Sequence, residues 1–169
     1  MIHDSYIAIT LLAAAAIAAG FFAYVYTLKR QTYLLLWTAG WSFFALHYLS
    51  PALAPWLASG PVQVALNRWL YALAGLSFVL GAQFYSQRKA WKTAAGVAAV
   101  ALGVWAAANA LGWFTIVPVV IPSICLYLAV GTIFWIESRR QETLADRLLA
   151  ISFFAWEIGR ASCRERVWR

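Results

Sequence analysis

The stretch YIAITLLAAAAIAAGFFAYVYTL, residues 6–28, decides the fold class because it holds no charged residue over its whole length. A membrane-spanning helix needs about 20 mostly apolar residues, which rise by about 1.5 Å each. Further windows of this kind cover residues 33–49, 64–85, 93–114 and 117–136, and a last one opens at Leu148 but stops being apolar after Trp156. Because the connectors are short, we predict an all-α, polytopic membrane helix bundle with five full spans and a truncated sixth.

The composition agrees with a membrane protein. Hydrophobic residues make up 64% of the 169-residue chain, and only 11% of the residues are charged. Soluble domains carry about 25% charged residues. The mean hydropathy is +0.72. These values argue against a soluble domain, a disordered chain and a nucleic-acid-binding protein, although the net charge of +7 would otherwise suit nucleic acid.

Basic residues predict the orientation because they occupy every second connector. They follow the first, third and fifth windows: Lys29, Arg30, Arg88, Lys89, Lys92, Arg139, Arg140 and Arg147. The connectors at residues 50–63 and 112–115 carry no charge. Basic loops stay in the cytoplasm, so we expect the N-terminus to lie outside.

The end of the chain, EIGRASCRERVWR at residues 157–169, does not fit a helix that has entered from the cytoplasm. An arginine at the centre of a span costs at least about 2.5 kcal/mol. Back-translated, residues 157–167 resemble a common short-read sequencing adapter. We therefore treat residues 1–156 as an incomplete membrane sensor or anchor domain and residues 157–169 as a non-native tail. We expect the native protein to continue beyond Trp156, and a seventh helix would have to precede any cytoplasmic domain.

Two polar residues in or near the predicted spans are candidate ligand contacts, because polar groups in membranes often serve a function. His47 lies near the outer end of the second window, where it either contacts a ligand or bonds a neighbouring carbonyl or water. Arg68 lies at the outer start of the third window, beside Trp69. It either binds an anionic ligand or headgroup or snorkels to the interface, and we favour snorkelling.

Aromatic residues form a stripe on the second window at helical spacing. Its members are Trp37, Trp41, Phe44 and Tyr48. The stripe either lines an aromatic pocket or packs on neighbouring helices or lipid, and packing is the commoner role. Gly40 on an adjacent stripe would allow a helix to approach closely.

Pro118 and Pro122 in the fifth window are candidate hinge residues, because proline frees backbone carbonyls in a helix. No metal-binding spacing, catalytic motif or phosphate loop occurs, so we expect no metal, no cofactor and no catalytic site in this chain. The carboxylates Glu137, Glu142 and Asp146 lie in the cytoplasmic connector, where we expect a solvated helix face.

The segment YLLLWTAGWSFFALHYLSPAL, residues 33–53, resembles the second helix of the N-terminal membrane sensor regions of bacterial histidine kinases and diguanylate cyclases. The positions that fit the L-x-x-W-x-x-G/A-W pattern are Leu34, Trp37, Gly40 and Trp41. Residues 66–89 resemble the next segment of such regions, and the likeness covers roughly residues 5–155. It implies a bacterial inner-membrane module that senses or anchors, with a catalytic domain downstream in a two-component or cyclase protein.

Together these observations predict a sensory and anchoring module of a bacterial signal-transduction protein, a histidine kinase in the leading case. A small-molecule or lipid signal would bind between the outer halves of the second, third and fifth windows, at Trp41, His47, Arg68 and Trp69. The expected surroundings are the lipid bilayer, with a homodimer forming through the full-length protein and no nucleic acid. The alternative is a fragment of a small multi-span transporter or permease that binds its solute near the proline-containing fifth window.

Overall fold

The computed structural model describes residues 2–53, 60–86, 92–111, 116–141, 144 and 147–155. Side chains are described from Tyr6 onward within these ranges, except those of residues 51–52, 92–97, 99, 110, 116–123 and 141. The elements are α1 (Ile2–Lys29), α2 (Thr32–Leu53), α3 (Pro61–Tyr85), α4 (Lys92–Ala110), α5 (Ile116–Gln141) and a helical segment at residues 147–155. No strand occurs in these ranges, which confirms the predicted all-α class.

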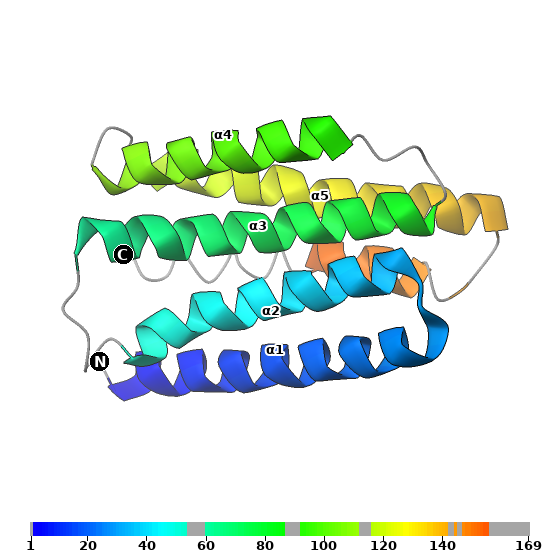
Figure 1. The fold of residues 1–169 in the computed structure, drawn as a ribbon, viewed down its shortest axis with the longest axis horizontal. Coiled ribbons are helices and arrows are strands. Elements are labelled where there is room, and N and C mark those ends of the chain that lie inside the picture. The colour runs from blue at the N-terminus through cyan, green and yellow to red at the C-terminus, as the bar shows by residue number, and fades with distance from the viewer. Residues whose placement is uncertain are drawn as a thin grey trace.

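The helices lie side by side in an up-and-down bundle. α1, α3 and α5 run in one direction, and α2, α4 and the segment at 147–155 run in the other (Figure 1). α3 is the central helix, because it packs against α2, α4 and α5, whereas α1 packs against α2. Consecutive helices are therefore mostly neighbours, as short connectors require.

Small residues explain why α3 can occupy the centre. Its buried positions include Ala72, Ala74, Gly75, Gly81 and Ala82. Helices in membranes approach most closely where such residues face one another. At Gly75 the approach is so close that an added Cβ would lie 3.1 Å from the Cβ of Leu126 on α5.

A left-handed residue makes the sharp turn between α1 and α2. Arg30 has φ 53°, and its N–H donates to the Tyr26 carbonyl at 2.8 Å, which caps the end of α1. The Arg30 guanidinium lies 5.8 Å from the centre of the Tyr26 ring. Lys29 and Arg30 thus sit at the negative end of the α1 dipole, where basic side chains are stabilising.

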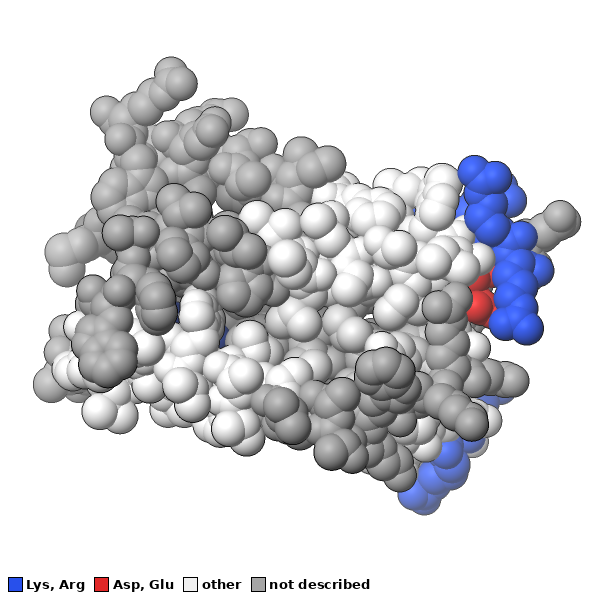
Figure 2. Space-filling view, turned by 90° about the horizontal axis from the view of Figure 1, so that it is seen from above, with Lys and Arg blue, Asp and Glu red and all other residues white. Residues whose placement is uncertain are grey.

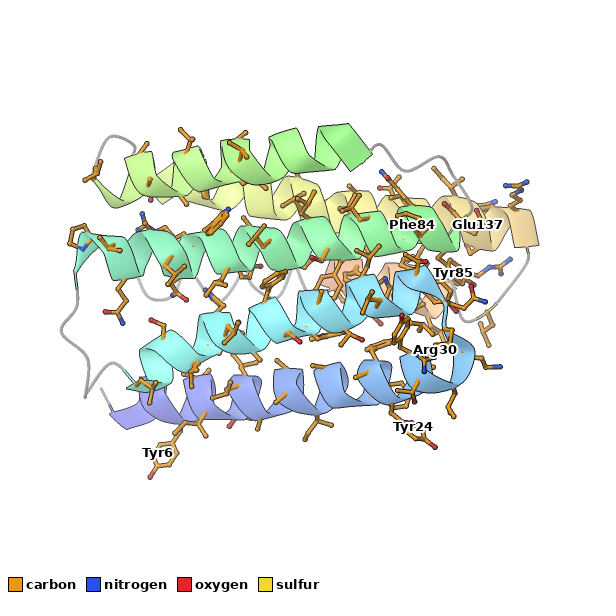
Figure 3. The ribbon with its side chains drawn as sticks, in the orientation of Figure 1. Tyr6, Tyr24, Arg30, Phe84, Tyr85 and Glu137 are labelled. Atoms are coloured by element: carbon orange, nitrogen blue, oxygen red, sulfur yellow. The ribbon has the colours of Figure 1, made fainter. Side chains whose placement is uncertain are left out.

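Aromatic side chains fill the interior between the helices. The Trp37 ring of α2 lies 5.1 Å from Phe22 of α1 and 5.5 Å from Phe134 of α5, both edge to face. Tyr85 at the end of α3 lies 5.3 Å from Tyr33 and 5.7 Å from Phe134. These contacts connect all the helices except α4 at the end of the bundle where Arg30 and Tyr85 lie (Figure 3).

Two of the described helices are long and apolar enough to cross a membrane by length and composition, Tyr6–Lys29 and Pro61–Tyr85. The structure therefore gives weak support to membrane association, and the five predicted spans are not confirmed. α2 holds two tryptophans, two tyrosines and His47 among its apolar residues. In α5 the side chains of the first turns lie outside the described residues.

The expectation of a solvated acidic face is wrong for Glu137. Its side chain is only 2% exposed and the neighbouring Ser138 is buried as well. Figure 3 places Glu137 in the last turns of α5, at the same end of the bundle as Tyr85. Helical spacing explains the burial, because Glu137 lies one turn after Phe134 and on the same inward face. Glu142 and Asp146 lie outside the described residues.

Candidate ligand-binding site

His47 connects α2 to α3 near the end of the bundle that lies away from Arg30. Its Nδ1 atom lies 3.0 Å from the backbone carbonyl oxygen of Asn67. Because a carbonyl oxygen only accepts, this contact requires the Nδ1–H tautomer of the imidazole. The ring also lies 5.0 Å from the ring of Tyr71, one turn further along α3. His47 therefore fits the interpretation of a histidine that bonds a neighbouring carbonyl.

Arg68 and Trp69 follow Asn67 but point to different parts of the bundle. Arg68 is half-buried, and its Nη1 atom is enclosed by protein. Trp69 turns toward α4, where a Cβ on Gly103 would lie 3.1 Å from its Nε1 atom. The structure thus brings His47 to the backbone of α3 immediately before Arg68, and it separates Trp69 from His47.

The proposed hinge residues lie in α5, whose helix runs unbroken from Ile116 to Gln141. The side chains of Pro118 and Pro122 are outside the described residues.

A hollow of about 560 Å³ opens between the C-terminal end of α2 and the N-terminal end of α3, and five of its lining residues are leucines. At its edge Gln63 Nε2 donates to Ser50 Oγ at 3.0 Å. Neither His47 nor Arg68 lines this hollow. It lies between two of the three helices that were expected to form the outer pocket, but its lining residues include none of α5 and none of the four predicted ligand contacts.

Trp41 belongs to a different site, a cavity of about 180 Å³ in the interior. Four helices and the segment at 147–155 contribute to its wall. The aromatic side chains that line it are Phe22, Trp37, Trp41, Phe44, Phe78, Tyr127 and Phe153. The other lining residues are Leu149 and Ser152.

The rings in this cavity contact one another in edge-to-face, tilted and stacked arrangements. Trp41 lies 5.2 Å from Phe78 and 5.9 Å from Phe44 between ring centres. Phe153 lies 6.0 Å from Phe78 and 6.4 Å from Tyr127. Aromatic pairs at these separations stabilise each other by about 0.5–1.5 kcal/mol beyond simple burial, so the wall is held in place without a ligand.

The cavity lies toward the basic end of the bundle and not in the outer halves of the helices. Trp37 and Trp41 are in the first half of α2, and Phe78 is in the second half of α3. Both of these halves adjoin the end where Lys29 and Arg30 lie. His47 does not line the cavity, but the two adjoin through Phe44, which lines the cavity and lies 6.2 Å from the His47 ring between ring centres.

Sequence reasoning found Trp37, Trp41 and Phe44 as an aromatic stripe but missed the rest of the wall. Phe22, Phe78 and Phe153 come from three other elements, and nothing in a single helix indicates which of its aromatic residues will meet those of another. Gly40 indicated a close approach of another helix to α2, and Phe78 of α3 makes this approach: a Cβ at Gly40 would lie 2.7 Å from the Phe78 ring.

The described residues contain no cluster of three or more histidine, cysteine, aspartate or glutamate side chains that could hold a metal. The residues that line the cavity are aromatic apart from Leu149 and Ser152. No family model, no curated protein and no solved structure matches the chain.

Proposed function

We propose that this chain is the membrane-embedded sensory and anchoring module of a bacterial signal-transduction protein, with a histidine kinase as the leading case. The module would lie in the inner membrane as five full spans and a sixth, with the N-terminus outside. A separate cytoplasmic domain would supply catalysis.

The observation that carries this proposal is the position of the basic side chains. Lys29, Arg30, Arg139, Arg140 and Arg147 gather at one end of the bundle (Figure 2). Two of them lie against aromatic rings at that end, Arg30 on Tyr26 and Arg139 on Trp135 at 5.4 Å. A basic end with aromatic neighbours is typical of the cytoplasmic interface of a membrane protein.

The lengths and outer faces of the helices support the same placement. The shortest of α1 to α5, α4, has 19 residues. At about 1.5 Å per residue even this helix approaches the roughly 30 Å of the hydrocarbon layer. Large apolar side chains cover the outside of α1, where Ile17 is 74% exposed. Such a surface needs an apolar solvent or a partner.

Signal transmission would work by a change of helix packing. A ligand that fits one packing arrangement better than another shifts the population toward it. The elements that would carry the change to the cytoplasm are α5, which ends at the basic end, and the segment at 147–155, which packs on α5 through Phe134 and Phe153, 6.3 Å apart. The aromatic cavity is the better input site, because Leu149, Ser152 and Phe153 of this segment line it directly.

The deciding experiment is to sequence the genomic locus past the codon for Trp156 and to assay the complete protein. We expect a histidine kinase or diguanylate cyclase domain and an output that depends on an external signal. Leu149→Phe, which fills the aromatic cavity, should reduce the response of that output. A continuation with five or more further membrane helices and no cytoplasmic domain would instead establish a transporter and overturn the proposal.

A further inference from the structure

We infer that the aromatic cavity is a binding site for a neutral, apolar molecule about the size of one aromatic ring. The inference deepens the proposed function, because it names the ligand class of the cavity that we propose as the input site, and its entry path rests on the proposed membrane placement. It rests on the chemistry of the wall, its volume and the position of its rim.

The wall excludes charged ligands. None of its lining residues is ionisable in the physiological range, since it consists of aromatic side chains, Leu149 and Ser152. The Ser152 hydroxyl already donates to the Leu148 carbonyl at 2.8 Å, as serines in membrane helices commonly do. A charged ligand would lose its hydration here without gaining an ion pair.

An aromatic wall can also bind an organic cation through ring faces. The ring geometry disfavours this alternative. Trp41 and Phe78 meet at an interplanar angle of 67°, and Phe22 and Trp37 meet at 75°. Their faces are thus covered in part by the edges of other rings, and few faces remain to surround a cation. A neutral ring adds further edge-to-face contacts of the same kind.

The volume sets the size of the ligand. Apolar protein cavities of about 150 Å³ remain free of water and bind benzene. The cavity described above measures about 180 Å³, which leaves room for a single ring with one or two substituents. A larger polycyclic molecule would have to displace the rings of the wall.

The rim of the cavity gives an apolar molecule a path from the bilayer. Ser152 lines the cavity and is exposed, so the cavity reaches the surface beside the segment at 147–155. The neighbouring Ile151 is 52% exposed on the same segment, so the surface around the rim is apolar. A ligand of the proposed class concentrates in lipid and would enter sideways.

Benzene binding to the full chain in detergent micelles tests the inference. The protein is labelled with 5-fluorotryptophan, and the ¹⁹F resonances of Trp37, Trp41 and Trp69 are assigned from single Trp→Phe variants. We expect benzene to shift the Trp41 resonance saturably. Trp69 is the internal control, because it faces α4 and lines a separate hollow beside Gly103. Its resonance therefore reports benzene that partitions into the micelle or binds outside the aromatic cavity.

Two adjacent leucines provide matched variants. Leu149→Phe adds a ring inside the cavity and should weaken benzene binding by at least about tenfold. Leu148→Phe is the control, because Leu148 is 55% exposed outside the cavity, and its affinity should remain within about twofold of the parent. If Leu149→Phe does not fold, Ser152→Leu at the rim replaces it, with Ile151→Leu as its control.

Several results would overturn the inference. Equal, non-saturable shifts of Trp41 and Trp69 would show simple partitioning into the micelle. Unchanged affinity in folded Leu149→Phe would place the binding site elsewhere. A saturable Trp41 shift with tetramethylammonium but none with benzene would indicate a cation site. In nanodiscs, selective broadening of the Trp41 resonance by doxyl-labelled acyl chains with no response to benzene would show that lipid fills the cavity. If benzene binds in the cavity but the complete gene encodes no signalling domain, the proposed function is wrong and the binding site remains.

Discussion

Gly81 is the residue where the packing of the bundle leaves the least room. A Cβ at this position would collide with the Trp37 indole, which forms part of the aromatic cavity. Gly81→Ala must therefore displace Trp37 or part α2 from α3, and we expect it to lower the free energy of unfolding by about 1–3 kcal/mol. Thermal unfolding in detergent measures the loss.

The control for this substitution is Gly20→Ala in α1. A Cβ at Gly20 meets nothing within 4 Å, so the only change is a better helix former. Its melting temperature should stay equal or rise slightly, because alanine is favoured over glycine in a helix by about 0.5–1 kcal/mol. Equal losses in the two variants would contradict the close approach of Trp37 to Gly81.

His47 offers a second test at the residue scale, because its hydrogen bond and its ring contacts can be separated. His47→Phe keeps a ring beside Tyr71 but removes the donor to the Asn67 carbonyl. Hydrogen bonds between membrane helices contribute about 0.6 kcal/mol on average, so the loss should be of that order. His47→Ala should cost more, because it also removes the ring contacts. Thermal unfolding measures both losses, and an unchanged melting temperature in His47→Phe would show that the hydrogen bond does not stabilise the contact between α2 and α3.

The sequence predicted the environment of a single residue only where the residue's own side chain determines that environment. The predicted close approach at Gly40 is confirmed by the contact with Phe78, because a missing side chain creates space in any helix packing. Glu137 was assigned to a solvated face, yet it is buried. Whether the Glu137 side chain is buried depends on how far the inward face of α5 extends past Phe134. The residues near Glu137 in the sequence do not indicate this.

At the scale of elements, the helices themselves were predictable. The window at residues 64–85 corresponds to α3 (Pro61–Tyr85), and the window at 117–136 falls within α5 (Ile116–Gln141). Long apolar runs of this kind favour helices. In α3, Gly60 and Pro61 also mark the first turn, because proline is favoured at the first position of a helix. The short connectors also predicted that consecutive helices would be neighbours, but they did not predict which faces pack together, since helices that are apolar on all sides do not show which face will be buried.

The segment at residues 147–155 gives a prediction about an element. Its Phe153 touches Phe78, Tyr127 and Phe134, so it fastens the segment to α3 and α5. Phe153→Ala leaves a void between these rings. Because lipid is as apolar as the core, moving the phenyl ring between them changes the free energy little, and the void accounts for most of the effect. We therefore expect the free energy of unfolding to fall by about 1–2 kcal/mol.

Ile151→Ala on the same segment is the matched control, because Ile151 is 52% exposed and touches none of these rings. Its unfolding temperature in detergent should stay close to that of the parent chain. A loss in Phe153→Ala no greater than in Ile151→Ala would mean that the segment does not pack on α3 and α5 in solution.

At the scale of the whole molecule, the distribution of charge makes the orientation in a membrane testable. In a background of Cys125→Ala and Cys163→Ser, single cysteines are placed at Gln31, between α1 and α2, and at Val62, in the first turn of α3. Gln31 adjoins the basic end, and Val62, 79% exposed, lies at the opposite end. Positive charge stays in the cytoplasm, so Val62→Cys should react with a membrane-impermeant maleimide in intact spheroplasts, and Gln31→Cys only after permeabilisation. The reverse pattern would place the N-terminus inside. Labelling of both sites in intact cells would mean that the bundle does not cross the membrane, so that its exposed apolar faces would have to be covered by another protein.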